Sequence, residues 1–231
     1  MKTVLGLCAT AVIVLLVATQ AQALGLADLS NKDAAAGLKQ ALIKGSQAAV
    51  ASLGRQDGFL KNERVKIPLP ESLHKVEGLM RGLGMGKYAD QLVTTMNRAA
   101  ESAVVEAKPL LVNAVKNMSV QDAKAILGGG QDAATQYFRR TTSAPLTDKF
   151  LPIVAKATQK VKLAEKYNAF AGRAARFGLV DAKDADLNSY VTRKALDGLY
   201  LIIADEERKI RQDPVGAASG IISKVFGAIG K

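Results

Sequence analysis

Apolar side chains recur every three to four residues along almost the whole chain, a spacing typical of amphipathic helices. The alternation typical of half-buried strands is nearly absent. Capping residues, glycines and prolines divide the pattern into expected helices at about 30–54, 71–83, 87–109, 119–127, 132–142, 145–164, 163–177, 186–211 and 215–229. Because the loops are short and no interdomain linker is visible, the sequence predicts an all-α, single-domain, mostly antiparallel multi-helix bundle.

Prolines set several of the expected boundaries. Pro109 is expected to kink or end its helix, because proline lacks the N–H that an interior turn requires. Pro145, which follows Ser143 closely, predicts a new helix start, and Pro152 predicts a kink further on. The loop 55–70 ends in two prolines that force extended backbone on the residues before them.

Two of the expected helices should contribute long buried faces. Residues 196–203 are apolar almost all round, so their helix is expected to run through the middle of the bundle. The helix that starts near residue 87 should bury one face, which comprises Tyr88, Leu92, Met96, Ala99 and Ala103.

The first 23 residues have the three-part plan of a secretory signal peptide. Lys2 gives a positive start, an apolar run follows at 4–17, and Ala21 and Ala23 are the small residues that a signal peptidase reads. The apolar run is shorter than the roughly 20 residues of a comfortable membrane-spanning helix, although an uncleaved anchor is the alternative. We therefore expect cleavage after Ala23, and a periplasmic or secreted mature domain, 24–231, without a transmembrane span.

Cysteine and histidine are almost missing, which narrows the chemistry. Cys8 is the one cysteine and lies in the predicted signal, so the mature chain would have no thiol and no disulfide. His74 is the one histidine, and it is expected at the surface. This composition excludes the common zinc sites and any triad built on another histidine. We expect neither a metal site nor a cofactor.

The chain is basic, with 32 lysines and arginines against 21 acidic residues. Lys2 is the one charged residue of the predicted signal, which leaves the mature chain at +10. An anionic envelope component, such as lipid or lipopolysaccharide, or a protein partner could use this charge. Nucleic acid is not expected, because the cations are scattered among acids with no aromatic platform. A solvated mixed surface is the favoured interpretation.

Glu206 is the most informative polar residue, because it follows the apolar stretch directly. At 100° per residue it lies on the same side as Leu199 and Ile202, so it could be a buried acid at the centre of a polar pocket. The favoured alternative is that the helix has left the core there and that Glu206 pairs with neighbours in water. If it is buried, Glu206→Gln should cost more stability than Glu207→Gln.

Three arginines are candidate partners of that acid. Arg98 can pair with Glu101 one turn away, and a solvated surface pair is the favoured interpretation. Arg139 and Arg140 follow Tyr137, and such a patch could bind a phosphate or carboxylate. The favoured alternative is that the rings of Tyr137 and Phe138 lie in the core and that the two arginines pair with acids elsewhere in the chain. The candidate ligand pocket therefore comprises Glu206, Arg98, Arg139, Arg140 and Tyr137.

Four segments resemble a known bacterial family. They are VKIPLP at 65–70, TMNRAAE at 95–101, the stretch 132–142, and KALDGL at 194–199, and they resemble the family of unknown function DUF4197. The resemblance covers essentially the whole mature chain. It implies an exported helical protein of Gram-negative bacteria, and it carries over no activity, cofactor or catalytic residue.

Three functions are compatible with the sequence. The first is a non-enzymatic protein that binds a partner or ligand through its helix surfaces. The second is a carrier of a lipid or other apolar or anionic ligand in an interhelical pocket. The third and weakest is an enzyme using Glu206 with an arginine, because no base, nucleophile and orienting group occur together. The helix expected at 215–229 could dock on the bundle or on a membrane.

Overall fold

The computed structural model describes residues 31–176, 181 and 184–213 of the chain. This part consists of α-helices joined by loops, with no strand among the described residues. The helices are α1 (Asn31–Gly54), α2 (Glu71–Gly82), α3 (Gly86–Val104), α4 (Ala107–Lys116), α5 (Val120–Leu127), α6 (Ala133–Thr158), α7 (Lys162–Arg176) and α8 (Leu187–Gln212). The all-α prediction is confirmed. The predicted signal peptide and the helix expected at 215–229 lie outside the described residues.

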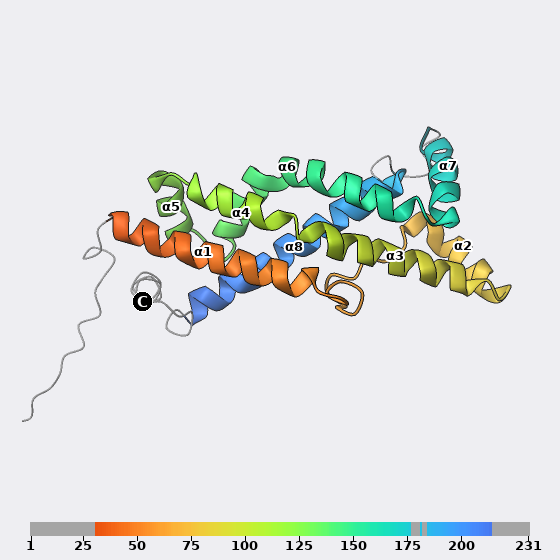
Figure 1. Ribbon diagram of the computed structural model, residues 1–231, viewed down its shortest axis with the longest axis horizontal. Helices are drawn as coiled ribbons and strands as arrows, with labels where there is room; N and C mark the ends of the chain where they lie inside the picture. The colour runs from red at the N-terminus through yellow and green to blue at the C-terminus, as the bar shows by residue number, and fades with distance from the viewer. Residues whose placement is uncertain (1–30, 177–180, 182–183, 214–231) are drawn as a thin grey trace, which may run out of the picture.

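The long helices lie along one axis and alternate in direction (Figure 1). α1 runs away from the α5 end, α3 and α4 return, α6 runs out again, and α8 returns obliquely. α2 and α7 lie at the opposite end of the molecule from α5. This is the alternation that short connections between amphipathic helices impose. None of the described helices is long and apolar enough to cross a membrane.

α8 runs through the middle of the bundle, as predicted. It packs against α1, α3 and α6, and Leu199, Tyr200 and Ile203 on it are almost fully buried. Burying each such side chain contributes about 1.5–3 kcal/mol of transfer free energy, so α8 is a main source of the fold's stability.

The predicted inner face of α3 is correct except at its first position. Leu92, Met96, Ala99 and Ala103 are buried, whereas Tyr88 is 44% exposed. Tyr88 lies close to the turn between α2 and α3, which Figure 1 places at the extremity of the molecule, beyond the helices that cover the rest of α3. The sequence pattern could not show where the neighbouring helices end.

The helix start predicted at Pro145 is wrong. α6 is a single helix that contains both Pro145 and Pro152. Each proline removes one helical hydrogen bond, but both lie on the exposed side of α6, where water can bond the carbonyls left free. On the opposite side, Leu146 and Phe150 are fully buried, and their packing keeps the helix continuous.

The helix predicted at 87–109 ends early and is followed by α4, which the pattern did not predict, whereas the starts predicted at 119 and 186 are correct to within one residue. α3 ends at Val104, and Pro109 lies in the first turn of α4, where a missing N–H costs little. Ser119 and Asp122 form a reciprocal capping box at the start of α5. Asp186 caps α8 by accepting a hydrogen bond from the backbone N–H of Ser189 at 2.7 Å.

Candidate functional site

Residues 55–70, hereafter the strap, cross from α1 to α2 and are fixed on α3. Asn97 holds the strap at Ile67 through two hydrogen bonds. Its Oδ1 accepts from the Ile67 backbone N–H at 2.8 Å, and its Nδ2 donates to the Ile67 carbonyl at 2.9 Å. Glu101 Oε1 accepts from the backbone N–H groups of Phe59 and Leu60, each at 3.1 Å. Side chains of α3 thus supply the partners that this loop backbone lacks.

Arg98 and Glu101 form the predicted pair, at 2.7 Å between Nη1 and Oε2. The interpretation of this pair as a solvated surface contact is wrong, because Glu101 is only 4% exposed. Arg98 also bonds Asp57 at 2.6 Å. Bonds from Lys61 and Arg98 lower the pKa of the Asp57 carboxyl. Arg98 is therefore part of the strap's anchor.

The strap also lies directly on α8. A Cβ added at Gly198 would be 2.8 Å from Phe59 Cε1 and 3.2 Å from Val65 Cβ, so glycine permits the close approach. Tyr190 donates from its hydroxyl to the Pro68 carbonyl at 3.1 Å, and burial raises the pKa of Tyr190 to about 12. The strap is therefore held between α3 and α8.

The buried acid of α8 is Glu207, and the interpretation of Glu206 as the buried acid is wrong. Glu207 is 4% exposed. Its carboxylate accepts from the backbone N–H groups of Ala134 and Thr135 at 2.9 and 2.8 Å, and from the Thr135 hydroxyl at 2.8 Å. Arg211, one turn further along α8, bonds the same carboxylate at 2.9 Å. Glu207 thus caps the first turn of α6 from another helix and offsets the partial positive charge there.

Glu206 follows the favoured alternative instead. It is 23% exposed in its side chain and pairs with Lys209 at 2.7 Å. It faces α1, where a Cβ added at Gly45 would lie 3.5 Å from Glu206 Cβ. Glu206 and Glu207 lie about 100° apart around α8, and both sides of the helix are covered. The free N–H groups of α6, which lie on the Glu207 side, determine which acid is buried.

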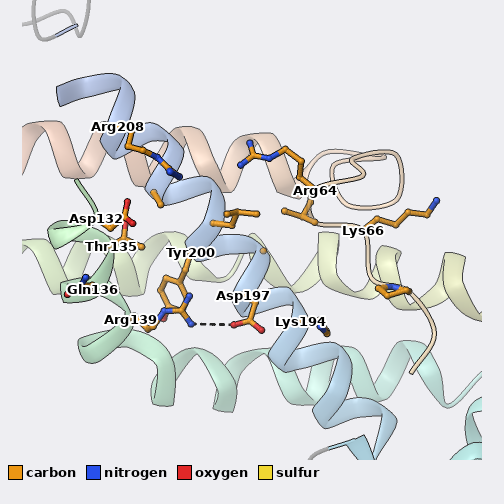
Figure 2. A pocket seen from close by; sticks show the side chains of 15 residues that line it. Arg64, Lys66, Asp132, Thr135, Gln136, Arg139, Lys194, Asp197, Tyr200 and Arg208 are labelled. Carbon is orange, nitrogen blue, oxygen red and sulfur yellow. Dashed lines mark hydrogen bonds and ion pairs between the residues drawn. The ribbon is translucent and has the colours of Figure 1, made fainter. Parts of the chain in front are cut away.

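An open cavity of about 630 Å³, hereafter the groove, lies between the strap, the first half of α6 and α8. Figure 2 shows its polar side chains. Five cations and two acids line it, namely Arg64, Lys66, Arg139, Lys194, Arg208, Asp132 and Asp197. The lining therefore has an excess of positive charge.

The guanidinium groups of the groove are held by acids and by one aromatic ring. Arg139 pairs with Asp197 at 3.3 Å (dashed line in Figure 2) and lies 4.7 Å from the centroid of the Tyr200 ring. Arg64 bonds both oxygens of Asp205, and Arg208 bonds Asp205 at 2.9 Å. The bond from Arg64 lowers the pKa of the Asp205 carboxyl. These contacts fix the guanidinium positions in advance, in a geometry suited to carboxylates.

The structure does not gather the five predicted site residues in one cavity. Arg139 lines the groove, whereas Arg140 and Tyr137 line a separate cavity of about 450 Å³ between α4, α5 and α6. Arg140 lies 3.6 Å from Asp122 and above the Tyr137 ring, and the Tyr137 hydroxyl donates to the Ala114 carbonyl at 2.8 Å. This agrees with the favoured interpretation of both rings in the core and both arginines on acids.

Sequence reasoning missed the other cations of the groove, namely Arg64, Lys66, Lys194 and Arg208. Arg64 and Lys66 lie in the strap, far in the sequence from Lys194 and Arg208 of α8, and the path of the strap over α8 brings the two pairs together. One signal was present, since the segments 65–70, 132–142 and 194–199 that carry the family resemblance all line the groove. The fourth segment, 95–101, supplies Asn97 and Glu101 to anchor the strap.

No metal-binding site is evident in the part of the chain that the structure describes. No group of three or more His, Cys, Asp or Glu side chains there could hold a metal ion. His74 is exposed, as predicted, and its Nε2 lies 3.1 Å from the Leu69 carbonyl oxygen.

The comparisons with known proteins give one match. The family model described as "Protein of unknown function (DUF4197)" matches residues 28–227. Among curated proteins and among solved structures, no match was found. The groove and the strap both lie inside the matched range.

Proposed function

The chain belongs to the DUF4197 family, and we propose that it is a non-enzymatic binding protein whose groove holds an acidic segment of a partner protein. The observation that carries this proposal is the convergence of three guanidinium groups from three separate elements. Arg64 comes from the strap, Arg139 from α6 and Arg208 from α8. Each is already oriented by a carboxylate of the chain itself, and a partner's carboxylates can exchange with these.

The shape and charge pattern of the groove suit an extended peptide. Lys194 and Arg208 are 14 residues apart on α8, about 21 Å at 1.5 Å per residue. That length accommodates about six residues of extended chain. Asp132 and Asp197 interrupt the cations, so a polyanion with a charge at every step, such as nucleic acid, would meet repulsion. An acidic peptide can place its carboxylates beside the cations alone.

The polar groups of the groove are bonded to other side chains of the protein in a way that supports binding over catalysis. Asp197 bonds Arg139, and the Tyr200 hydroxyl lies 2.9 Å from the Thr142 hydroxyl. Neither arrangement sets a nucleophile beside a base with a third group to orient it. Glu206, on which the enzyme alternative depended, pairs with Lys209 outside the groove.

We also propose that the protein acts after export, in the periplasm of a Gram-negative bacterium. The three-part leader at 1–23 supports this location. Intact mass measurement of protein from the periplasmic fraction tests it, and the expected N-terminus is Leu24. Recovery of chains that begin at Met1 in the cytoplasmic fraction would contradict it.

Fluorescence anisotropy with a labelled eight-residue peptide of alternating glutamate and glycine tests the groove. We expect binding that weakens as salt rises, because exposed charges are screened. Arg139→Gln should weaken binding by about tenfold, since one carboxylate contact of about 1.5 kcal/mol is lost. The matched control is Arg140→Gln, since the neighbouring Arg140 also pairs with an aspartate and lies above a tyrosine ring. Equal loss in both variants, or binding insensitive to salt, would contradict the proposal.

A further inference from the structure

A third cavity of about 460 Å³, hereafter the side pocket, lies between α6 and α8 and adjoins the groove. The two cavities share Arg139, Asp197 and Tyr200 as lining residues. We infer that the side pocket receives an apolar side chain of the acidic segment, and that the Thr192 hydroxyl hydrogen-bonds the backbone of that segment. This inference rests on the proposed function of the groove and adds a requirement for one apolar residue.

Thr192 is the first observation that supports it. The residue is 2% exposed and lines the side pocket. Within residues 31–176 and 184–213, its hydroxyl is the buried side-chain polar atom that has no hydrogen-bond partner. Threonines in helices ordinarily bond the carbonyl four residues back, as Thr142 and Thr158 do in α6. A buried hydroxyl without a partner is costly, so Thr192 is a polar group that a ligand can satisfy.

The apolar wall of the side pocket is the second observation. Leu196 and Tyr200 follow Thr192 at four-residue intervals, so the three side chains lie on one face of α8. Leu151 of α6 forms the facing wall and is 37% exposed. A hydroxyl next to an apolar surface matches a peptide, in which a carbonyl lies one residue away from an apolar side chain. A hydrocarbon chain would leave the hydroxyl unpaired.

The position of the side pocket relative to the cations sets the order of groups in the peptide. Arg139, which pairs with Asp197, lies at the junction of the two cavities. Lys194 and Arg208 line the groove but not the side pocket. The occupant is therefore an acidic peptide with an apolar residue at one end of its run of carboxylates. That end lies beside Thr192 of α8.

Three labelled probes test the inference against the full chain. They are the glutamate–glycine peptide described above, the same peptide with a terminal leucine, and the same peptide with a terminal serine. We expect the leucine peptide to bind about tenfold more tightly than the serine peptide, since burying a leucine contributes at least 1.5 kcal/mol. Thr192→Val keeps the shape of the side chain and removes the hydroxyl. This variant should weaken binding of the leucine peptide by about fivefold, or reduce the tenfold preference for the leucine peptide over the serine peptide by the same factor. It should leave the melting temperature equal or higher.

Different outcomes separate the two proposals. If all three peptides bind alike and Arg139→Gln still weakens them, the groove's function stands and the side-pocket inference is wrong. If none binds, both fail. A lower melting temperature in Thr192→Val with unchanged affinity would show that Thr192 is structural only. If sodium decanoate displaces the leucine peptide equally well from wild type and Thr192→Val, a hydrocarbon chain is the occupant and the inference is overturned.

Discussion

The buried carboxylates that hold the frame differ from the more accessible ones at the groove. Glu101 and Glu207 are each 4% exposed, and each accepts hydrogen bonds from two backbone N–H groups and from an arginine on its own helix. Asp197 is 51% exposed in its side chain and bonds a guanidinium alone. Moving a frame acid leaves N–H groups unpaired in the interior, whereas water can replace the partner of Asp197. The difference shows which acids can exchange partners when a ligand arrives.

The largest effect is expected from Glu207→Gln. The amide would turn an N–H₂ group toward donors at the start of α6 and remove the negative charge that Arg211, only 13% exposed, bonds at 2.9 Å. We expect a loss of about 3 kcal/mol in the free energy of unfolding, measured by urea denaturation. The matched control is Glu206→Gln, which breaks a partly exposed pair and should cost less than about 1 kcal/mol.

This order reverses the one expected if Glu206 were the buried acid. Equal midpoints for the two variants would show that Glu207 does not hold α6 to α8. A larger loss for Glu206→Gln would contradict the structural assignment of the buried acid.

Glu101→Gln is expected to have the next largest effect, about 2 kcal/mol. Glutamine can keep the oxygen that accepts from the strap but loses the ion pair with Arg98. The strap should then open more often, and trypsin should cleave at Arg55 and Lys61 faster than in wild type. Glu106→Gln, at an exposed position beside α4, is the control. Cleavage rates that do not differ between the two variants would show that Glu101 does not secure the strap.

Gly198→Ala tests the contact between the strap and α8. Alanine gains about 1 kcal/mol in helix propensity, but its Cβ would press on Phe59 and Val65, which costs about 1–3 kcal/mol. We expect a net loss of about 1 kcal/mol and weaker binding of the acidic peptide, because the strap forms one wall of the groove. Gly78→Ala in α2, where a Cβ meets nothing within 4 Å, should be stabilising. Stabilisation by both substitutions would contradict the close approach at Gly198.

The fold follows from local patterns, whereas the groove does not. The capping box at Ser119 and the apolar stretch 196–203 each specify structure within a few residues, and the structure confirms both. The continuity of α6 through Pro145 depends on which side of the helix is buried, and Glu207 is selected by N–H groups of another helix. Such long-range partners have no signature in periodicity. Arg139 was singled out by its neighbours in sequence, but the cations around it were not.

Acid should weaken the contact between Arg64 of the strap and Asp205 of α8. Arg64 lowers the pKa of Asp205 in the folded chain, so this pair stabilises the fold fully above the ordinary aspartate pKa. The contribution is lost as the pH falls from about 4 toward the folded value. We expect the melting temperature of wild type to exceed that of Asp205→Asn at pH 7, and the gap to close below pH 4. A gap that stays constant across this range would contradict the pairing.

Asp197→Asn should have the smallest effect on stability and a useful effect on binding. Asp197 and Arg139 are both about half exposed, so their pair contributes between zero and about 1 kcal/mol. Removing its charge frees Arg139 for a ligand's carboxylate, since the internal competitor is gone. We expect an unchanged melting temperature and a two- to threefold higher affinity for the acidic peptide, on the order of 0.5 kcal/mol. Weaker binding in this variant would mean that Asp197 orients Arg139 for the ligand, and the distinction between exchangeable and fixed acids would then fail at the groove itself.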